Sequence, residues 1–443
     1  MVFSTVDEVD VSARTGSVHE HGWQSWSPTS TYPVSASVSP RPQLHWQQLM
    51  RYRPETPAPS GGFQGEGLLV VEPGTGSPCH VYSAPEPGQT VPSIRANLVG
   101  DRLLVESVGP VRAEVVEGGI ETSLERFGDE LARVLGLGTP RPAPTVWCSW
   151  YHYFLDVTEE DILENLTAIG AHGFDVDVVQ VDDGWQADVG DWLGLSGRFS
   201  SLSDLAGTIR DTGRRAGIWV APFIAGELSE LARQHPDWLV GEAGHNWGQD
   251  LRGLDLTHPG ARDYVWSVFR NLRELGFDYY KLDFLYGGAL PGERYQDLTG
   301  VAAYRSGLEV IRNAIGPESY LLGCGAPILP SVGLVDGMRV SPDTYHPTDS
   351  AEEQRRLRGR SCAVARAWQP GRFWVNDADC LVARPSFAAR REWAEVVDRY
   401  SGLRSASDRI ADFDDWGLET TRRHFATTPP PTPFPPTRSP SRP

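Results

Sequence analysis

The sequence has few of the features that place a chain in a membrane or in a disulfide-bonded class. No run approaches the ~18 apolar residues of a membrane-spanning helix. The first ten residues, MVFSTVDEVD, contain no apolar stretch, so we expect no signal peptide. The few cysteines are odd in number, scattered and without a CxxC pair, which predicts reduced thiols, a cytoplasmic location and no zinc site. They are Cys79, Cys148, Cys324, Cys362 and Cys380.

Positively charged residues are also fewer than negatively charged ones. Lysine and arginine total 40 against 58 aspartates and glutamates, and the net charge is −18. Nucleic acids and anionic membranes attract proteins through basic patches, so we expect neither as a partner. The sequence contains no phosphate-binding loop and no metal-ligand spacing, so we expect neither a cofactor nor a metal.

The composition divides the chain into three parts. In residues 1–138, short apolar runs such as EGLLVVEP recur between turn residues, which predicts a short β-sandwich-like domain. A Pro-rich stretch then marks a boundary. Residues 139–425 alternate short apolar segments with amphipathic ones, and residues 426–443 form a Pro-rich tail without core-forming residues.

The middle part contains eight strand-like segments, most of them followed by a helical stretch. This order predicts a (β/α)₈ barrel, whereas the alternative, a doubly wound sheet, usually has fewer strands. The best-marked helix is TEEDILENLTAIGAHG, with Thr158 as its cap, acids in its first turn and a glycine at its end. The segments span residues 145–151, 174–183, 216–224, 277–284, 319–326, 337–343, 372–379 and 402–408.

Polar and aromatic residues gather where these strands end. The carboxyl ends of barrel strands meet on one face, where the chemistry of this fold takes place. In YYKLDF, Lys281 and Asp283 are two residues apart and therefore point to the same side of their strand. Burying so many polar groups is costly unless they bind something. The candidates are Trp150, Asp182, Asp183, Trp219, Lys281, Asp283, Cys324, Arg339 and Asp343.

Several carboxylates beside cations and aromatic faces favour glycoside hydrolysis. In that reaction one carboxylate attacks the anomeric carbon, and a second one protonates the leaving oxygen. Neighbouring acids such as Asp182 and Asp183 can each bind sugar hydroxyls, while tryptophan rings pack on the apolar face of a pyranose.

Five motifs then carry a family resemblance. In this order, WCSWYHYF, VDDGWQ, YYKLDF, CGAP and RVSPD resemble the α-galactosidases of glycoside hydrolase family 36 in clan D, a bacterial type with an N-terminal β-sandwich. The resemblance covers roughly residues 20–425 and includes HGWQSWS and GEGLLV near the N-terminus. It implies a retaining glycosidase that releases terminal α-linked galactose without a cofactor. The β-domain that usually follows the barrel in this family is expected to be absent.

The resemblance also implies roles for individual residues. Asp283 matches the catalytic nucleophile, and Asp343 matches the general acid/base. The other candidates match sugar-binding positions: Asp182 and Asp183 for O4 and O6, Lys281 for O3 and O4, Arg339 for O2, Trp150 and Trp219 as pocket aromatics, and Cys324 beside the C2 substituent.

Other interpretations remain open at this point. Lys281 and Asp283 could form a structural ion pair, and the two tryptophans could be core residues. The same fold could serve an α-N-acetylgalactosaminidase or a transglycosylase like raffinose synthase, depending on the room that Cys324 leaves beside C2. A catalytically silent sugar-binding protein is the alternative from another class. The expected partner is an α-galactoside, and a homo-oligomer is left open.

Overall fold

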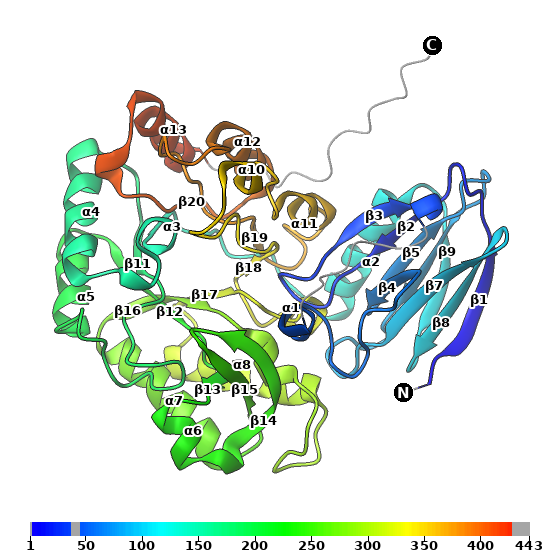
Figure 1. Cartoon of the computed structure of the whole chain (residues 1–443), viewed down its shortest axis with the longest axis horizontal. Coiled ribbons are helices and arrows are strands. Elements are labelled where there is room, and N and C mark those ends of the chain that lie inside the picture. Colours follow the sequence, from blue (N-terminus) through cyan, green and yellow to red (C-terminus); the bar gives the residue numbers. More distant parts are fainter. Residues whose placement is uncertain (1, 37–44, 428–443) are drawn as a thin grey trace.

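The N-terminal part of the chain consists of two antiparallel sheets, which Figure 1 shows in blue and cyan to one side of the molecule. The computed structural model describes residues 2–36 and 45–427. One sheet has the order β1 (Ser4–Asp10), β8 (Arg102–Val108), β7 (Ser93–Val99), β4 (Phe63–Glu66). The other has the order β3 (Ser30–Pro33), β2 (Ser17–Glu20), β5 (Leu68–Glu72), β6 (Cys79–Ser83), β9 (Arg112–Val116).

Strand β5 shows why this part of the chain packs in layers. Its side chains alternate between two faces, as in every strand. Leu69 and Val71 join a buried cluster with residues of both sheets, including Phe63 and Ile94, so the sheets face each other as a sandwich. Leu68 and Val70 point the other way, into the large core that continues into the barrel. The sandwich is therefore buried on one outer face as well.

The second part is a barrel of eight parallel strands. They lie next to one another in chain order, and the eighth pairs with the first. A bridge between Leu381, just after the seventh strand, and Ala406 of the eighth closes the ring. The predicted fold class is thus confirmed. The strands are β10 (Val146–Cys148), β11 (Val178–Val181), β12 (Arg215–Val220), β16 (Phe277–Leu282), β17 (Tyr320–Gly323), β18 (Gly337–Arg339), β19 (Val375–Asp377) and β20 (Ser405–Ala406).

Helices surround this barrel. The predicted helix is α4 (Glu159–His172), with a Thr158 capping box and a left-handed glycine after its last residue. No helix in residues 2–36 and 45–427 is long and apolar enough to cross a membrane. The other longer ones are α5 (Leu202–Asp211), α7 (Pro259–Glu274), α8 (Gly300–Ile315), α12 (Arg390–Tyr400) and α13 (Asp415–Ala426), whereas α2 (Ile120–Val134) packs against β5 and β6 of the N-terminal sheet.

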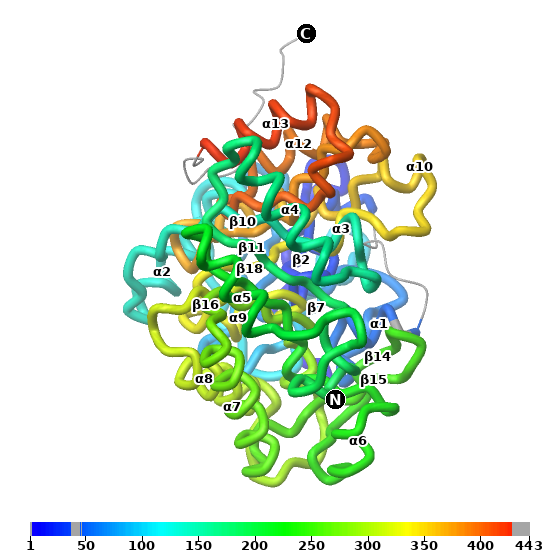
Figure 2. Tube along the Cα trace, turned by 90° about the vertical axis from the view of Figure 1, so that its left-hand side faces the viewer, coloured from blue at the N-terminus to red at the C-terminus, as the bar shows by residue number. Residues whose placement is uncertain are grey.

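Short helices and one small sheet lie in the connections. The sheet has the order β13 (Ile224–Gly226), β15 (Gln249–Leu254), β14 (Leu239–Asn246) and extends from the end of β12. The helices are η1 (Val34–Ala36), α1 (His45–Arg51), α3 (Trp150–Tyr153), η2 (Phe154–Asp156), α6 (Glu230–Gln234), η3 (Pro236–Trp238), η4 (Leu285–Ala289), α9 (Ile328–Ser331), α10 (Ala351–Gln354), α11 (Arg360–Ala365) and η5 (Ile410–Asp412). In Figure 2, α1 lies beside the β14–β15 hairpin, and its contacts with β14 join the N-terminal part to the barrel.

The domain boundaries at 138 and 425 stay predictions. Strand β9 and helix α2 precede the first boundary, and β10 follows it. From residue 428 on, the predicted tail lies outside the described residues.

Candidate active site

Strand β16 directs Lys281 and Asp283 toward the inside of the barrel. Tyr279 packs in a cluster with residues of β10, β11 and β17 that fills the lower barrel, so its face of the strand looks inward. Tyr280 lies in the core outside the barrel and packs edge-on against Phe269 of α7. By alternation, Lys281 and Asp283 follow Tyr279 on the inner face, one above the other, up to the mouth of the barrel.

Asp283 is held by two N–H donors. The indole Nε1 of Trp219 donates to its Oδ2 at 3.1 Å, and the backbone N–H of Phe284 donates to its Oδ1 at 2.8 Å. Phe284 has a φ of 51°, in the left-handed region, which costs free energy for a residue with a large side chain. The carboxylate is therefore fixed in position at the end of the strand and has few ways to rotate.

Lys281 pairs with Asp182 rather than with Asp283. Its Nζ lies 2.9 Å from Asp182 Oδ2, and both side chains are buried. The same oxygen accepts hydrogen bonds from Gln180 Nε2 at 2.6 Å and from the Cys148 thiol at 3.2 Å. Burial disfavours the ammonium, but the Asp182 carboxylate keeps the pKa of Lys281 well above its ordinary value. The lysine thus stays charged on the same face of the strand as Asp283.

Asp183 has a different environment from its neighbour. Its Oδ1 accepts from Gln186 Nε2 at 2.7 Å, and its Oδ2 accepts from Trp247 Nε1 at 2.8 Å. Neither donor is charged. Burial raises the pKa of Asp183 to about 7, which these two hydrogen bonds only partly oppose. Asp183 can therefore exchange a proton near neutral pH.

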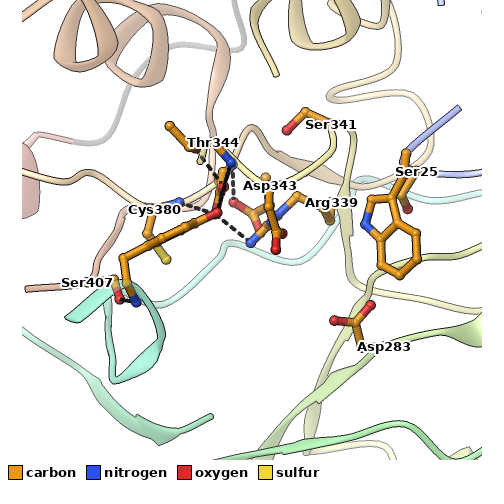
Figure 3. Close-up of polar contacts among 12 residues, drawn as sticks. Ser25, Asp283, Arg339, Ser341, Asp343, Thr344, Cys380 and Ser407 are labelled. Atoms are coloured by element: carbon orange, nitrogen blue, oxygen red, sulfur yellow. Dashed lines mark hydrogen bonds and ion pairs between the residues drawn. The ribbon is translucent and has the colours of Figure 1, made fainter. Parts of the chain in front are cut away.

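Arg339 holds three carboxylates together at the other side of the mouth. Its Nε lies 3.0 Å from Asp377 Oδ2, its Nη2 lies 2.7 Å from Asp379 Oδ1, and its Nη1 lies 3.2 Å from Asp343 Oδ1. Figure 3 shows Asp343 and Arg339 side by side, with Asp283 across the gap from them. Arg339 is buried, whereas the Asp343 side chain is 32% exposed and faces the opening. Two carboxylates from different strands thus face a common space.

The surroundings of Asp343 favour its protonated form. Burial and the nearby Asp379 carboxylate raise the pKa of Asp343, while Arg339 opposes them. Asp379 itself is anchored by Thr344, whose N–H and hydroxyl both donate to its Oδ2 at 2.9 and 2.7 Å. A carboxyl group with a raised pKa, across from one that hydrogen bonds hold fixed, suits the pairing of an acid with a nucleophile.

The remaining sequence candidates differ in how close they lie to this centre. Cys324 is fully buried just after β17, and burial together with the charge of Asp283 raises the pKa of its thiol well above its ordinary value. Trp150, at the start of α3, is half-buried and packs edge-on against Phe154, 5.1 Å between ring centroids. The ring of Trp150 thus packs against another aromatic ring, Phe154, rather than against one of the charged side chains named above.

Sequence reasoning overlooked several residues of this site. Trp247 reaches Asp183 from the turn of the β14–β15 hairpin, and no periodic pattern marks that turn. Asp377 and Asp379 are visible at the end of the seventh predicted strand, but nothing in the sequence shows that they share Arg339 with Asp343. Trp26, in the N-terminal HGWQSWS motif, packs against Phe284 at 4.9 Å between centroids. Long-range contacts of this kind leave no local signal.

Comparison with known proteins finds similarity to α-galactosidases. Residues 137–296 match the family model described as Melibiase. The α-galactosidase AgaA of Geobacillus stearothermophilus is 28% identical over 199 residues, 41% of this chain and 27% of the relative. The bifunctional α-galactosidase/sucrose kinase AgaSK of Mediterraneibacter gnavus is 29% identical over 32% of this chain and 16% of its own length. This chain thus aligns with about a quarter or less of these two relatives.

Solved structures match over more of the chain. The α-galactosidase TtGalA of Thermus thermophilus, in complex with p-nitrophenyl α-D-galactopyranoside, is 29% identical with a TM-score of 0.77, over 93% of this chain and 86% of that one. The crystal structure of AgaA has a TM-score of 0.61 at 16% identity, over 95% of this chain and 61% of that one. The predicted resemblance to glycoside hydrolase family 36 α-galactosidases is confirmed.

Proposed function

We propose that the protein is a retaining α-galactosidase that releases terminal α-linked galactose from oligosaccharides or glycosides. The observation that carries the proposal is the pair of carboxyl groups at the barrel mouth. Asp283 is fixed by Trp219 and Phe284, and Asp343 faces it with a raised pKa. The likeness to TtGalA, which was solved with an aryl α-galactoside and with stachyose, supports galactose as the sugar.

The proposed reaction is a double displacement. Asp283 attacks the anomeric carbon while Asp343 gives its proton to the leaving glycosidic oxygen, so a β-linked glycosyl-enzyme forms and the first alcohol departs. Asp343, now ionised, takes a proton from water. That water attacks the same carbon, breaks the bond to Asp283 and releases galactose with its original configuration. Arg339 stays close to Asp343 in both steps and stabilises its ionised form.

The sugar is held by groups that are already ordered. The Lys281–Asp182 pair offers N–H donors and carboxylate acceptors in a buried place, and Asp183 offers a second carboxyl beside it. Because their partners fix these side chains before the sugar arrives, little conformational entropy is lost on binding. The cytoplasm stays the proposed location, since all five cysteines are buried and unpaired.

An assay with aryl glycosides tests the proposal. We expect turnover of p-nitrophenyl α-D-galactopyranoside, with α-galactose as the first product by NMR, and much slower turnover of the α-N-acetylgalactosaminide, the α-glucoside and the β-galactoside. Asp283→Asn should lower kcat at least ~10³-fold because it removes the nucleophile. Asp278→Asn is the matched control, since this exposed residue lies on the same strand and pairs with Arg215 on the outer side.

Chemical rescue separates the roles of the two carboxyl groups. With azide present, Asp283→Ala should form the galactosyl azide of inverted configuration, whereas Asp343→Ala should form the retained one. A preferred N-acetylgalactosaminide substrate would point to the alternative sugar. Folded protein that binds galactosides without turnover would contradict the proposal and favour a sugar-binding protein.

A further inference from the structure

A second group of buried polar side chains lies away from the barrel mouth, where β2 meets the segment after α11. His19 and His21 are two residues apart on and just after β2, so both point away from the sandwich core that contains Val18. They face Arg366 and Trp368, and the rings of His21 and Trp368 lie 5.9 Å apart. These four side chains are at most 1% exposed.

Arg366 has no carboxylate partner within the described residues. Its Nη1 donates to the carbonyls of Ser25 at 2.7 Å and Val340 at 2.8 Å, and its Nη2 donates to the carbonyl of Gln24 at 2.9 Å. Burial lowers the pKa of Arg366 only to about 10, so the guanidinium keeps its charge at neutral pH. A fully buried cation that only carbonyl dipoles compensate is costly.

Several N–H groups around this cation have no partner among the described residues. Buried polar atoms of this kind are rare in folded proteins, and each one points to a bound ion or water. Burial keeps both histidines uncharged, with the pKa of His19 near 3, so each of them carries one N–H. The unpartnered donors are Arg366 Nε, Trp368 Nε1, Gln369 Nε2 and one ring N–H of His21, while Gln369 Oε1 and the other His21 nitrogen are unpartnered acceptors.

A surface cleft reaches His19, at the edge of this group. It has a volume of about 1160 Å³, and His19 lies in its wall. Four arginines line it against two glutamates, and two of the four are paired with acids outside the lining, Arg356 with Glu352 and Arg358 with Asp349. Among the lining residues alone, arginines outnumber glutamates by two, on a protein whose net charge is −18. The arginines are Arg356, Arg358, Arg360 and Arg399, and the glutamates are Glu72 and Glu121.

We propose that a chloride-sized monovalent anion binds between β2 and residues 366–369, accepting N–H hydrogen bonds from Arg366, Trp368, Gln369 and His21. The charge chemistry fits, because one monovalent anion neutralises one buried guanidinium. A small ion also suits the tight packing, since Trp368 is surrounded by Phe127 and Phe373. The anion would stabilise the contact between the N-terminal sheets and the barrel.

Crystals of the full chain grown or soaked in sodium bromide test this site directly. We expect an anomalous peak close to Arg366 Nε and the His21 ring. Density for water molecules alone at this place, without an anomalous signal, would overturn the proposal. This measurement needs no variant and does not depend on catalytic activity, so its outcome is independent of the proposed function.

Thermal unfolding gives a second test. At constant ionic strength, replacing sodium gluconate with sodium chloride should raise Tm by about 3 °C along a saturating curve, because an ion that binds only the folded state stabilises it. His21→Phe and Gln369→Leu should lose this dependence, whereas Gln234→Leu, an exposed control on α6, should keep it. An equal chloride response in all four proteins would contradict the site.

Discussion

Two arginines in this protein are equally buried but are compensated in opposite ways. Arg339, at the barrel mouth, touches three carboxylates, while Arg366, at the junction with the N-terminal sheets, touches only carbonyl oxygens. Burial acts against both cations. The carboxylates of Asp379 and Asp377 nevertheless raise the pKa of Arg339 well above its ordinary value, whereas the pKa of Arg366 falls to about 10. The same side chain thus holds carboxylates together in one place and lies among carbonyl oxygens in the other, where we propose a bound anion.

Of the changes that test this comparison, removal of the Arg339 side chain should lower the unfolding free energy most. Arg339→Met leaves three carboxylates close together without a cation, which should cost about 3–5 kcal/mol of unfolding free energy. Urea unfolding measures the loss, and kcat on the aryl galactoside should fall with it because Asp343 loses its partner. Arg270→Met, at an exposed pair with Glu274, is the control and should change stability by less than about 0.5 kcal/mol. Equal effects of the two variants would contradict the network.

Titration of Asp183 should give the next largest change in unfolding free energy. Its pKa is about 7 in the folded protein against 3.8 as the ordinary value, so the folded state binds more protons between these limits. Stability from this group is therefore present at low pH and is lost as pH rises toward 7. Asp183→Asn removes the loss, and its unfolding free energy relative to the parent should rise by about 3 kcal/mol from pH 5 to pH 8. Parallel stability curves for the two proteins would show that Asp183 does not titrate in this range.

Arg366→Met should be milder than Arg339→Met. The variant leaves the carbonyls of Gln24, Ser25 and Val340 without a donor, but it also removes a buried charge that no carboxylate balances. We expect a net loss of about 2 kcal/mol in unfolding free energy, together with the loss of the chloride response. A loss as large as that of Arg339→Met, with the chloride response intact, would show that the two arginines are compensated alike.

The smallest expected effect concerns Trp247. Trp247→Phe keeps the ring but removes the N–H that donates to Asp183 at 2.8 Å, so kcat/KM should fall about fivefold, which corresponds to about 1 kcal/mol. The lost hydrogen bond also raises the pKa of Asp183, which moves the midpoint of the stability curve to higher pH. Trp266→Phe, on the exposed face of α7, controls for loss of an indole elsewhere.

Much of the fold could be predicted because its signals are local. Short apolar segments separated by amphipathic ones mark all eight barrel strands, and the Thr158 capping box marks the start of α4. The strands are shorter than predicted, because the chain leaves the sheet just before residues such as Asp182 and Asp283. A polar residue at a strand end continues the alternating pattern whether or not it is still hydrogen-bonded to its neighbour strand.

The partners within the site were less accessible from the sequence. Lys281 and Asp283 are two residues apart, yet the ion pair of Lys281 is with Asp182 of another strand. The contact between Trp247 and Asp183 spans 64 residues and depends on the angle of a hairpin. Such pairs form only when the barrel closes, so the periodicity of apolar residues in the sequence does not predict them.

The sequence by itself determined the order of the strands, the two faces of each strand and the acids that reach the barrel mouth, because alternation and capping act over a few residues. Only the tertiary structure decided which charges share a partner. Arg339 contacts three carboxylates, whereas Arg366 contacts no carboxylate among the described residues. The free energy of a buried charge depends on everything within a few ångströms of it, and those neighbours come from distant parts of the chain.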